Sequence, residues 1–130
     1  MPLGYVVQDD DDWCDVFVSS VFSLNNLDHL IGRECGVNRH IDVMTRKGIW
    51  RGKAVTPQRG DIITFDWDKN RFADHIGIVE RVEGNIIHTI EGNTLPEGVE
   101  KGVRGVHRKQ YHVNDSNIRG FARPNYRASL

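Results

Sequence analysis

The chain carries a thiol, an imidazole and a carboxylate at positions from which they can act together. Cys14 follows a run of four aspartates and a tryptophan and opens an apolar stretch with helical spacing. His75 begins the strand-like segment HIGIVERV, while Glu91 and Asn93 lie in the segment TIEGNT. A thiol attacks carbonyl groups as the thiolate, and an imidazole can take its proton and later return it. These residue types permit acyl transfer through a cysteine nucleophile.

Two opposing electrostatic effects act on Cys14. Asp11 or Asp12 is suited to cap a helix over residues 13–24, and a helix N-terminus lowers the pKa of a thiol placed there. The aspartates raise the same pKa through their negative charge, so we expect them to face solvent. In the alternative interpretation, Cys14 is a small buried hydrophobic residue, which is the commonest use of a cysteine outside a disulfide.

The apolar pattern places helices first and strands afterwards. Spacing predicts one helix over 13–24 and shorter helices within 26–34 and 38–47. The predicted apolar face of the helix over 13–24 consists of Cys14, Phe17, Val18, Val21 and Leu24. From residue 56 the period changes to that of strands, with later strands expected near 103–108 and 118–122. This order predicts an α+β fold in which N-terminal helices pack on a C-terminal antiparallel sheet.

One predicted hairpin brings the chemistry-bearing residues together. Two β-rich arms, HIGIVERV and IIHTIEG, flank the turn sequence EGN. Arms of about seven residues return Glu91 or Asn93 to the neighbourhood of His75. A base needs an acceptor on its second ring nitrogen, and both residues qualify.

Composition narrows the class of protein. The 130 residues suit one domain over 1–130, and a net charge of −1 is unlike that of a nucleic-acid-binding protein. No apolar run reaches the roughly 18 residues that cross a bilayer, and no secretory signal is recognisable. We therefore expect neither a nucleic-acid nor a membrane partner. Cys14 and Cys35 are expected as thiols, because small disulfide scaffolds usually carry more cysteines.

Five blocks of the sequence resemble the CHAP family, the cysteine, histidine-dependent amidohydrolases and peptidases. They are WCDVFVSS, TPQRGDIITFDWD, DHIGIVERV, TIEGNT and GFARPNY, in this order, within residues 12–126. The resemblance implies a fold similar to the papain-like and NlpC/P60 folds. It also implies cleavage of an amide bond in bacterial peptidoglycan, often as a phage endolysin.

Site residues follow from the resemblance one by one. The family's nucleophile falls on Cys14, its general base on His75 and its third member on Glu91, with Asn93 matching the next polar position. The chain departs from the pattern at Asp15, where many relatives have a small apolar residue. It also begins closer to the cysteine motif than is usual in the family.

Other side chains suggest binding roles. Trp13 and Trp67 are candidates for contact with substrate, although aromatic residues at strand ends also serve as core or rim residues. Asp10 and Asp12 suggest a calcium site, but the spacing of a typical calcium loop is missing and a solvated capping segment is the preferred interpretation. Zinc at His29, Cys35 and His40 lacks a clear fourth ligand. We expect that no cofactor is required.

The functional hypothesis is a muramoyl-alanine amidase or an endopeptidase that acts at the bacterial cell wall. Without a recognisable signal, release through a phage holin or delivery within a virion would bring it there. A separate wall-binding domain or subunit is a further expected partner. The alternatives are an inactive wall-binding module and a CHAP-type amidase acting on a small molecule or peptide amide.

Overall fold

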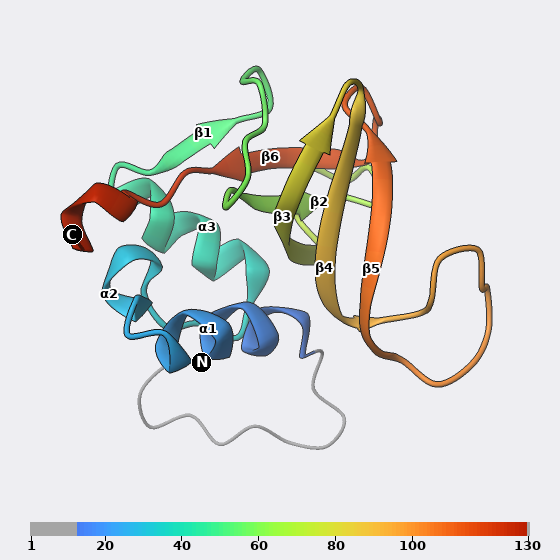
Figure 1. Ribbon diagram of the computed structural model, residues 1–130, viewed down its shortest axis with the longest axis horizontal. Helices are drawn as coiled ribbons and strands as arrows, with labels where there is room; N and C mark the ends of the chain where they lie inside the picture. The colour runs from blue at the N-terminus through green and yellow to red at the C-terminus, as the bar shows by residue number, and fades with distance from the viewer. Residues whose placement is uncertain (1–12, 130) are drawn as a thin grey trace.

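The computed structural model describes residues 13–129 (Figure 1). Three helices come first: α1 (Cys14–Leu24), α2 (Asp28–Ile31) and α3 (Val37–Arg46). The strands are β1 (Trp50–Gly52), β2 (Ile62–Phe65), β3 (His75–Glu83), β4 (Ile86–Thr94), β5 (Gly105–His112) and β6 (Ile118–Ala122). A short 3₁₀ helix, η1 (Tyr126–Ser129), follows β6. The predicted order of helices before strands is confirmed.

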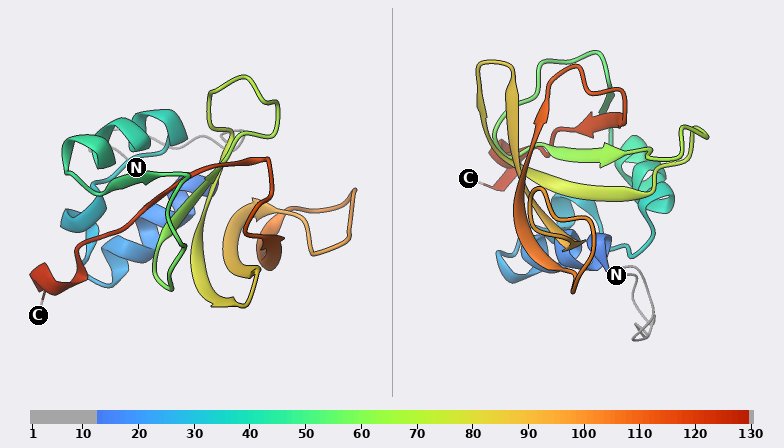
Figure 2. Two further views of the ribbon diagram at one scale, coloured as in Figure 1. Left: turned by 90° about the horizontal axis from the view of Figure 1, so that it is seen from above. Right: turned by 90° about the vertical axis from the view of Figure 1, so that its right-hand side faces the viewer.

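All the described strands join one antiparallel sheet in the order β1-β6-β2-β3-β4-β5. The helices gather beside the sheet, and β3, β4 and β5 extend away from them as long twisted strands (Figures 1 and 2). Helix α1 packs on β3 and β4, whereas α3 reaches β1. The α+β class with helices against an antiparallel sheet is therefore confirmed.

Helix α1 buries Cys14 and Val18 of the predicted apolar face, but not Leu24. Cys14, Val18 and Phe22 are buried as an i, i+4, i+8 row, whereas Leu24 is 83% exposed. The prediction for Leu24 was wrong because the last turn buries Phe22, which stacks with Tyr126, and the helix ends at Leu24. The N-cap position is Trp13, which makes no side-chain capping hydrogen bond, and Asp11 and Asp12 lie outside the described residues.

The sheet separates two apolar clusters. Ile62 and Ile76 lie on the side of the helices and share a cluster with Cys14. Ile63 and Phe65 lie on the opposite face, where they pack with Ile87, Ile118 and Phe121. Because successive strand residues point to opposite faces, β2 contributes to both clusters and is buried along its whole length.

The predicted β3–β4 hairpin is present. Val79 lies opposite Thr89 and Ile78 opposite Ile90, with a register shift further toward the turn. His75 begins β3 and Glu91 lies near the end of β4, so the hairpin carries both residues to the same end of the sheet. None of the described helices has the length and apolar character needed to cross a membrane.

Candidate active site

A buried histidine and a buried glutamate form the centre of the candidate site. His75 Nε2 lies 2.7 Å from Glu91 Oε1, and neither residue exposes more than a tenth of its surface. The lengths of the hairpin arms predicted that Glu91 or Asn93 lies near His75, and in the structure Glu91 lies beside the imidazole ring. Because a carboxylate only accepts, Nε2 carries the proton, and in the neutral ring Nδ1 then holds the lone pair.

Glu91 is held by two further donors. Thr89 Oγ1 donates to Glu91 Oε2 at 2.5 Å, and the Tyr111 hydroxyl donates to the same oxygen at 2.8 Å. Burial and the negative charge of Glu91 raise the pKa of Tyr111 well above its ordinary value, so the phenol stays protonated and remains a donor. Three donors on one carboxylate stabilise its ionised form inside the protein.

Sequence reasoning missed both donors. Thr89 stands two residues before Glu91 on one strand, and this spacing alone places both side chains on the same face. Tyr111 comes from β5, whose pairing with β4 brings it to the site. No local motif marks Tyr111, because its position depends on the register between two strands joined by a long loop.

Aromatic rings surround the imidazole. The ring centroids of Phe65, Trp67 and Tyr111 lie near one another, and Trp67 is 6.2 Å from His75. Trp67 stacks on Phe65 and is 40% exposed, so it forms part of the wall of a surface cavity that also includes His75. Asp74 fixes the preceding loop, since its Oδ2 accepts the backbone N–H of Trp67 at 2.5 Å.

Cys14 lies at the start of the helix that covers this end of the hairpin. It is buried in the same cluster as Ile76, the residue after His75. A Cβ added to Gly92, next to Glu91, would lie 2.5 Å from Phe17 Cβ and 2.9 Å from the ring of Trp13. The first turn of α1 therefore packs directly on β4 beside Glu91.

Two other predicted site residues flank this contact. Trp13 is half-buried against Gly92, immediately before Cys14. Asn93 adopts a left-handed backbone conformation (φ 54°) where the β4–β5 register is irregular, and its carbonyl accepts a hydrogen bond from Arg104. Asn93 is thus on the strand that carries Glu91.

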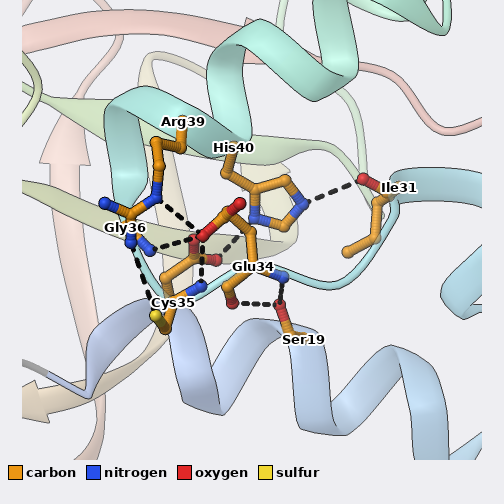
Figure 3. Close-up of polar contacts among 8 residues, drawn as sticks. Ser19, Ile31, Glu34, Cys35, Gly36, Arg39 and His40 are labelled. Atoms are coloured by element: carbon orange, nitrogen blue, oxygen red, sulfur yellow. Dashed lines mark hydrogen bonds and ion pairs between the residues drawn. The ribbon is translucent and has the colours of Figure 1, made fainter. Parts of the chain in front are cut away.

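A second buried histidine–carboxylate pair lies behind α1. His40 Nδ1 is 2.6 Å from Asp15 Oδ1, and His40 Nε2 donates to the Ile31 carbonyl at 2.9 Å (Figure 3). Burial raises the pKa of Asp15, and contact with His40 offsets only part of this effect. Asp15, the departure from the family pattern, therefore turns away from solvent and ties the helix of Cys14 to α3. The sequence analysis did not foresee this pair.

The residues considered for metals have other contacts. Both ring nitrogens of His40 are engaged, and Cys35 lies 3.5 Å from an Arg39 nitrogen. Within residues 13–129, no group of three or more candidate ligands is arranged to hold a metal ion. The calcium alternative falls on Asp10 and Asp12, which are outside the described residues.

The fold and site together define a class: this is an α+β protein with an imidazole held by a buried carboxylate. A family model described as "CHAP domain" matches residues 6–93, which is more than half of the chain and includes Cys14, His75, Glu91 and Asn93. The chain belongs to the CHAP domain family, as its motifs predicted. No curated protein matches it.

The solved structures that are similar to the chain include two of Ly7917. One is "The crystal structure of Ly7917", with 23% identity over 58% of this chain and a TM-score of 0.44. The other is "The crystal structure of Ly7917 with the hydrolyzing product of MDP", with 22% identity over 61% of this chain and a TM-score of 0.45. The chain spans about a third of the length of these structures, 31% and 33%.

Proposed function

We propose that this protein is a peptidoglycan hydrolase that cleaves an amide bond of the bacterial cell wall with Cys14 as the nucleophile. The observation that carries the proposal is the buried hydrogen bond between His75 and Glu91, which lies beside the first turn of the helix that Cys14 begins. Membership in the CHAP family supports the same chemistry. The place of action is the cell wall.

Activation of the thiol requires a base and a site for negative charge. His75 Nδ1 removes the proton from Cys14, and Glu91 stabilises the resulting imidazolium through Nε2. The start of α1 favours the thiolate through its dipole. The first hydrogen bond within the helix runs from Phe17 N–H to the Trp13 carbonyl. The N–H groups of residues 14–16 are therefore not used by the helix itself, and we propose that this turn stabilises the oxyanion.

The reaction then proceeds in two steps. The thiolate attacks the amide carbonyl, the C–N bond breaks, and His75 gives its proton to the departing amine, which leaves a thioester on Cys14. His75 next takes a proton from water, whose oxygen attacks the thioester. The C–S bond breaks, the carboxylic acid product leaves, and the thiol is restored. A metal ion takes no part in this scheme.

Trp13 and Trp67 are proposed to contact the substrate. Trp13 precedes the nucleophile, and the exposed ring of Trp67 forms a wall of the cavity at His75. Aromatic faces pack against sugar rings and peptide stems, and both are present in peptidoglycan. We propose an amidase or an endopeptidase, in a phage lysin or a related wall-degrading protein, with targeting assisted by a separate wall-binding domain or subunit.

The test measures the clearing of purified cell walls by the wild type and by Cys14→Ala and Cys14→Ser. Both substitutions should abolish clearing and leave the melting temperature nearly unchanged, since each alters few atoms at one buried position. Cys35→Ser is the matched control, because it removes the other thiol and should clear walls at the wild-type rate. Mass spectrometry of the released fragments then identifies the bond that is cut.

A folded Cys14→Ala protein that clears walls at the wild-type rate would overturn the proposal. Equal loss of clearing in Cys35→Ser would also contradict it, because this result would assign the effect to thiols in general.

A further inference from the structure

A second cavity, of about 460 Å³, lies away from the candidate active site. It is formed by the end of α3 and β1, by the loop before β2, and by the chain after β6. These segments adjoin because β6 pairs with both β1 and β2, and the C-terminal segment continues past the end of α3 (Figure 1). Seven of its lining residues lie in the blocks TPQRGDIITFDWD and GFARPNY, but Cys14, His75 and Glu91 are not among the lining residues.

The lining of this cavity is strongly cationic. It contains five of the chain's 17 lysines and arginines but only one of its 18 acidic residues, Asp61. Asp61 is already paired, since Arg123 Nε and Nη2 donate to its two oxygens at 3.0 and 2.9 Å. Four cations remain without an ion pair to any described carboxylate. They are Lys47, Arg51, Arg59 and Arg127.

The hydrogen bonds of these cations do not neutralise them. Lys47 Nζ donates to the His29 carbonyl at 3.0 Å, and Arg51 donates to the Gly48 carbonyl at 2.8 Å. Carbonyl oxygens carry no net charge, so the positive potential of the cavity persists. The chain as a whole has a net charge of −1, so this concentration of positive charge is local.

The base of the cavity is held in place by contacts with the core. Tyr126 donates its hydroxyl to the Gly60 carbonyl at 2.5 Å, and its ring stacks on the buried Phe22 at 6.3 Å between centroids. Burial raises the pKa of Tyr126 to about 12, so its hydroxyl remains a donor. Two hydrogen bonds also join Arg123 to Asp61, so the exposed cations surround a cavity that is already formed.

The cavity and the candidate active site lie at opposite ends of the same elements. Asp61 precedes β2, whereas His75 pairs with Phe65 at the other end of that strand, about 13 Å away at 3.3 Å per residue. Phe22 is eight residues from Cys14 along α1, a rise of about 12 Å. A ligand in the cavity therefore does not occupy the site at His75.

We propose that this cavity binds a phosphate-bearing anion and that the phosphodiester groups of an anionic cell-wall polymer are its source. Arginine forks match phosphate oxygens in pairs. One carboxylate would balance only one of the four cations, whereas a phosphodiester chain supplies a charge at every repeat. The choice of a wall polymer rests on the proposed function, while the anion site rests on the cavity alone.

A charge-matched comparison tests the site. Titration calorimetry measures the binding of short poly(glycerol phosphate) to the full chain, to Arg59→Gln/Arg127→Gln and to Arg81→Gln/Lys101→Gln. All four side chains are exposed, so both double variants should fold like the wild type. The cavity variant should bind at least about tenfold more weakly, and wild-type binding should weaken as salt is raised. The control variant should bind within about twofold of the wild type, because its two charges lie outside the cavity.

Binding measurements with other phosphate compounds identify the source of the phosphate. Inorganic phosphate should compete with the polymer but bind more weakly, because it engages fewer cations at once. Phosphate that binds as tightly as the polymer overturns the polymer as the source. A single-stranded oligodeoxynucleotide that binds more tightly than the polymer assigns the cavity to nucleic acid instead. Absence of polymer binding, or equal weakening in both double variants, overturns the anion site.

The test of the anion site and the test of the proposed function can be told apart, because each uses a different variant and a different readout. Cys14→Ala should bind the polymer like the wild type, and the cavity variant should release fragments from soluble peptidoglycan at the wild-type rate. Loss of polymer binding in Cys14→Ala, or loss of cleavage in the cavity variant, contradicts the independence of the two sites.

Discussion

Glu91 is a charge buried in the sheet, and its neighbours determine whether it can orient His75. Tyr111→Phe removes one of its three donors without removing the ring that packs beside Phe65. Loss of a hydrogen bond to a charged group costs about 1–3 kcal/mol, so we expect kcat for wall cleavage to fall about tenfold. Steady-state rates at saturating substrate measure this effect.

Tyr126→Phe is the control for this substitution. It removes another phenol hydroxyl that donates a hydrogen bond, to the Gly60 carbonyl, far from His75. Its expected effect is a lower melting temperature with unchanged kcat. Equal kcat values for Tyr111→Phe and the wild type would show that Glu91 does not depend on the phenol.

At the level of single residues, sequence reasoning succeeded where contacts are local. His75 and Glu91 lie on the two arms of one hairpin, so counting residues across the turn predicts that they lie close together. The Asp15–His40 pair joins α1 to α3 across 25 positions, and an aspartate in a first helical turn ordinarily suggests charge near solvent. Its burial depends on how the helices pack, and no single-sequence pattern contains this information.

Gly92 sets how closely α1 approaches the sheet. In Gly92→Ala the new methyl group would lie 2.5 Å from Phe17 Cβ and 2.9 Å from Trp13, so the first turn of α1 must move. We expect a loss of about 1–3 kcal/mol in the free energy of unfolding, together with loss of cleavage because Cys14 begins that turn. Denaturant melts and wall clearing measure the two effects.

Gly105→Ala is the matched control in the same sheet. There the added methyl group would meet only the His107 side chain, at 3.2 Å, and this side chain can rotate. Both stability and clearing should stay close to the wild type. An active and fully stable Gly92→Ala protein would contradict the close packing of α1 on β4.

Glu34 orders the turn between α2 and α3. Its Oε1 accepts the N–H groups of Cys35 and Gly36 and the Arg39 Nε (Figure 3). Burial raises the pKa of Glu34, but these donors outweigh burial and leave the pKa below its ordinary value. A carboxylate with a lowered folded pKa stabilises the protein above the unfolded pKa and loses this contribution as the pH falls through the folded pKa.

The pH dependence of Glu34→Gln follows from this sign. The variant should be less stable than the wild type at neutral pH, by an amount that stays constant down to the unfolded pKa of 4.5 and shrinks below it. Urea melts across the acid range measure the difference. Glu100→Gln, an exposed change in the β4–β5 loop, should alter stability little at any pH. A difference for Glu34→Gln that grows as the pH falls would reverse the assigned sign.

Most helices and strands were predicted near their observed positions, but strand β1 was not. The predicted strand over 118–122 coincides with β6, and the helix over 38–47 nearly coincides with α3. Strand β1 was missed because its three residues are defined only by pairing with β6, far along the chain. In α1 only the end of the predicted apolar face was wrong, because Phe22, and not Leu24, is buried and stacks on the ring of Tyr126.

On the scale of the whole molecule, one ion pair joins the segments that flank β2 and β6, two neighbouring strands that lie far apart in the sequence. Asp61 precedes β2 and Arg123, 62 positions later, follows β6, so most of the sheet lies between them in the sequence. The block GFARPNY was predicted to form the last part of the domain. The strands that pair with it were not predictable, because β1 and β2 lie far from β6 in the sequence. Asp61 is fully buried, and Arg123 donates to both of its carboxylate oxygens.

Arg123→Gln should therefore destabilise the protein by about 2–3 kcal/mol, because it leaves a buried carboxylate without its cation. Arg108→Gln provides the comparison, since Arg108 also contacts both oxygens of a carboxylate, on Glu80, but its own side chain is 74% exposed. An exposed pair contributes less than about 1 kcal/mol, so the melting temperature should respond far more to Arg123 than to Arg108. Similar melting temperatures for the two variants would mean that burial of Asp61 does not decide the strength of the pair.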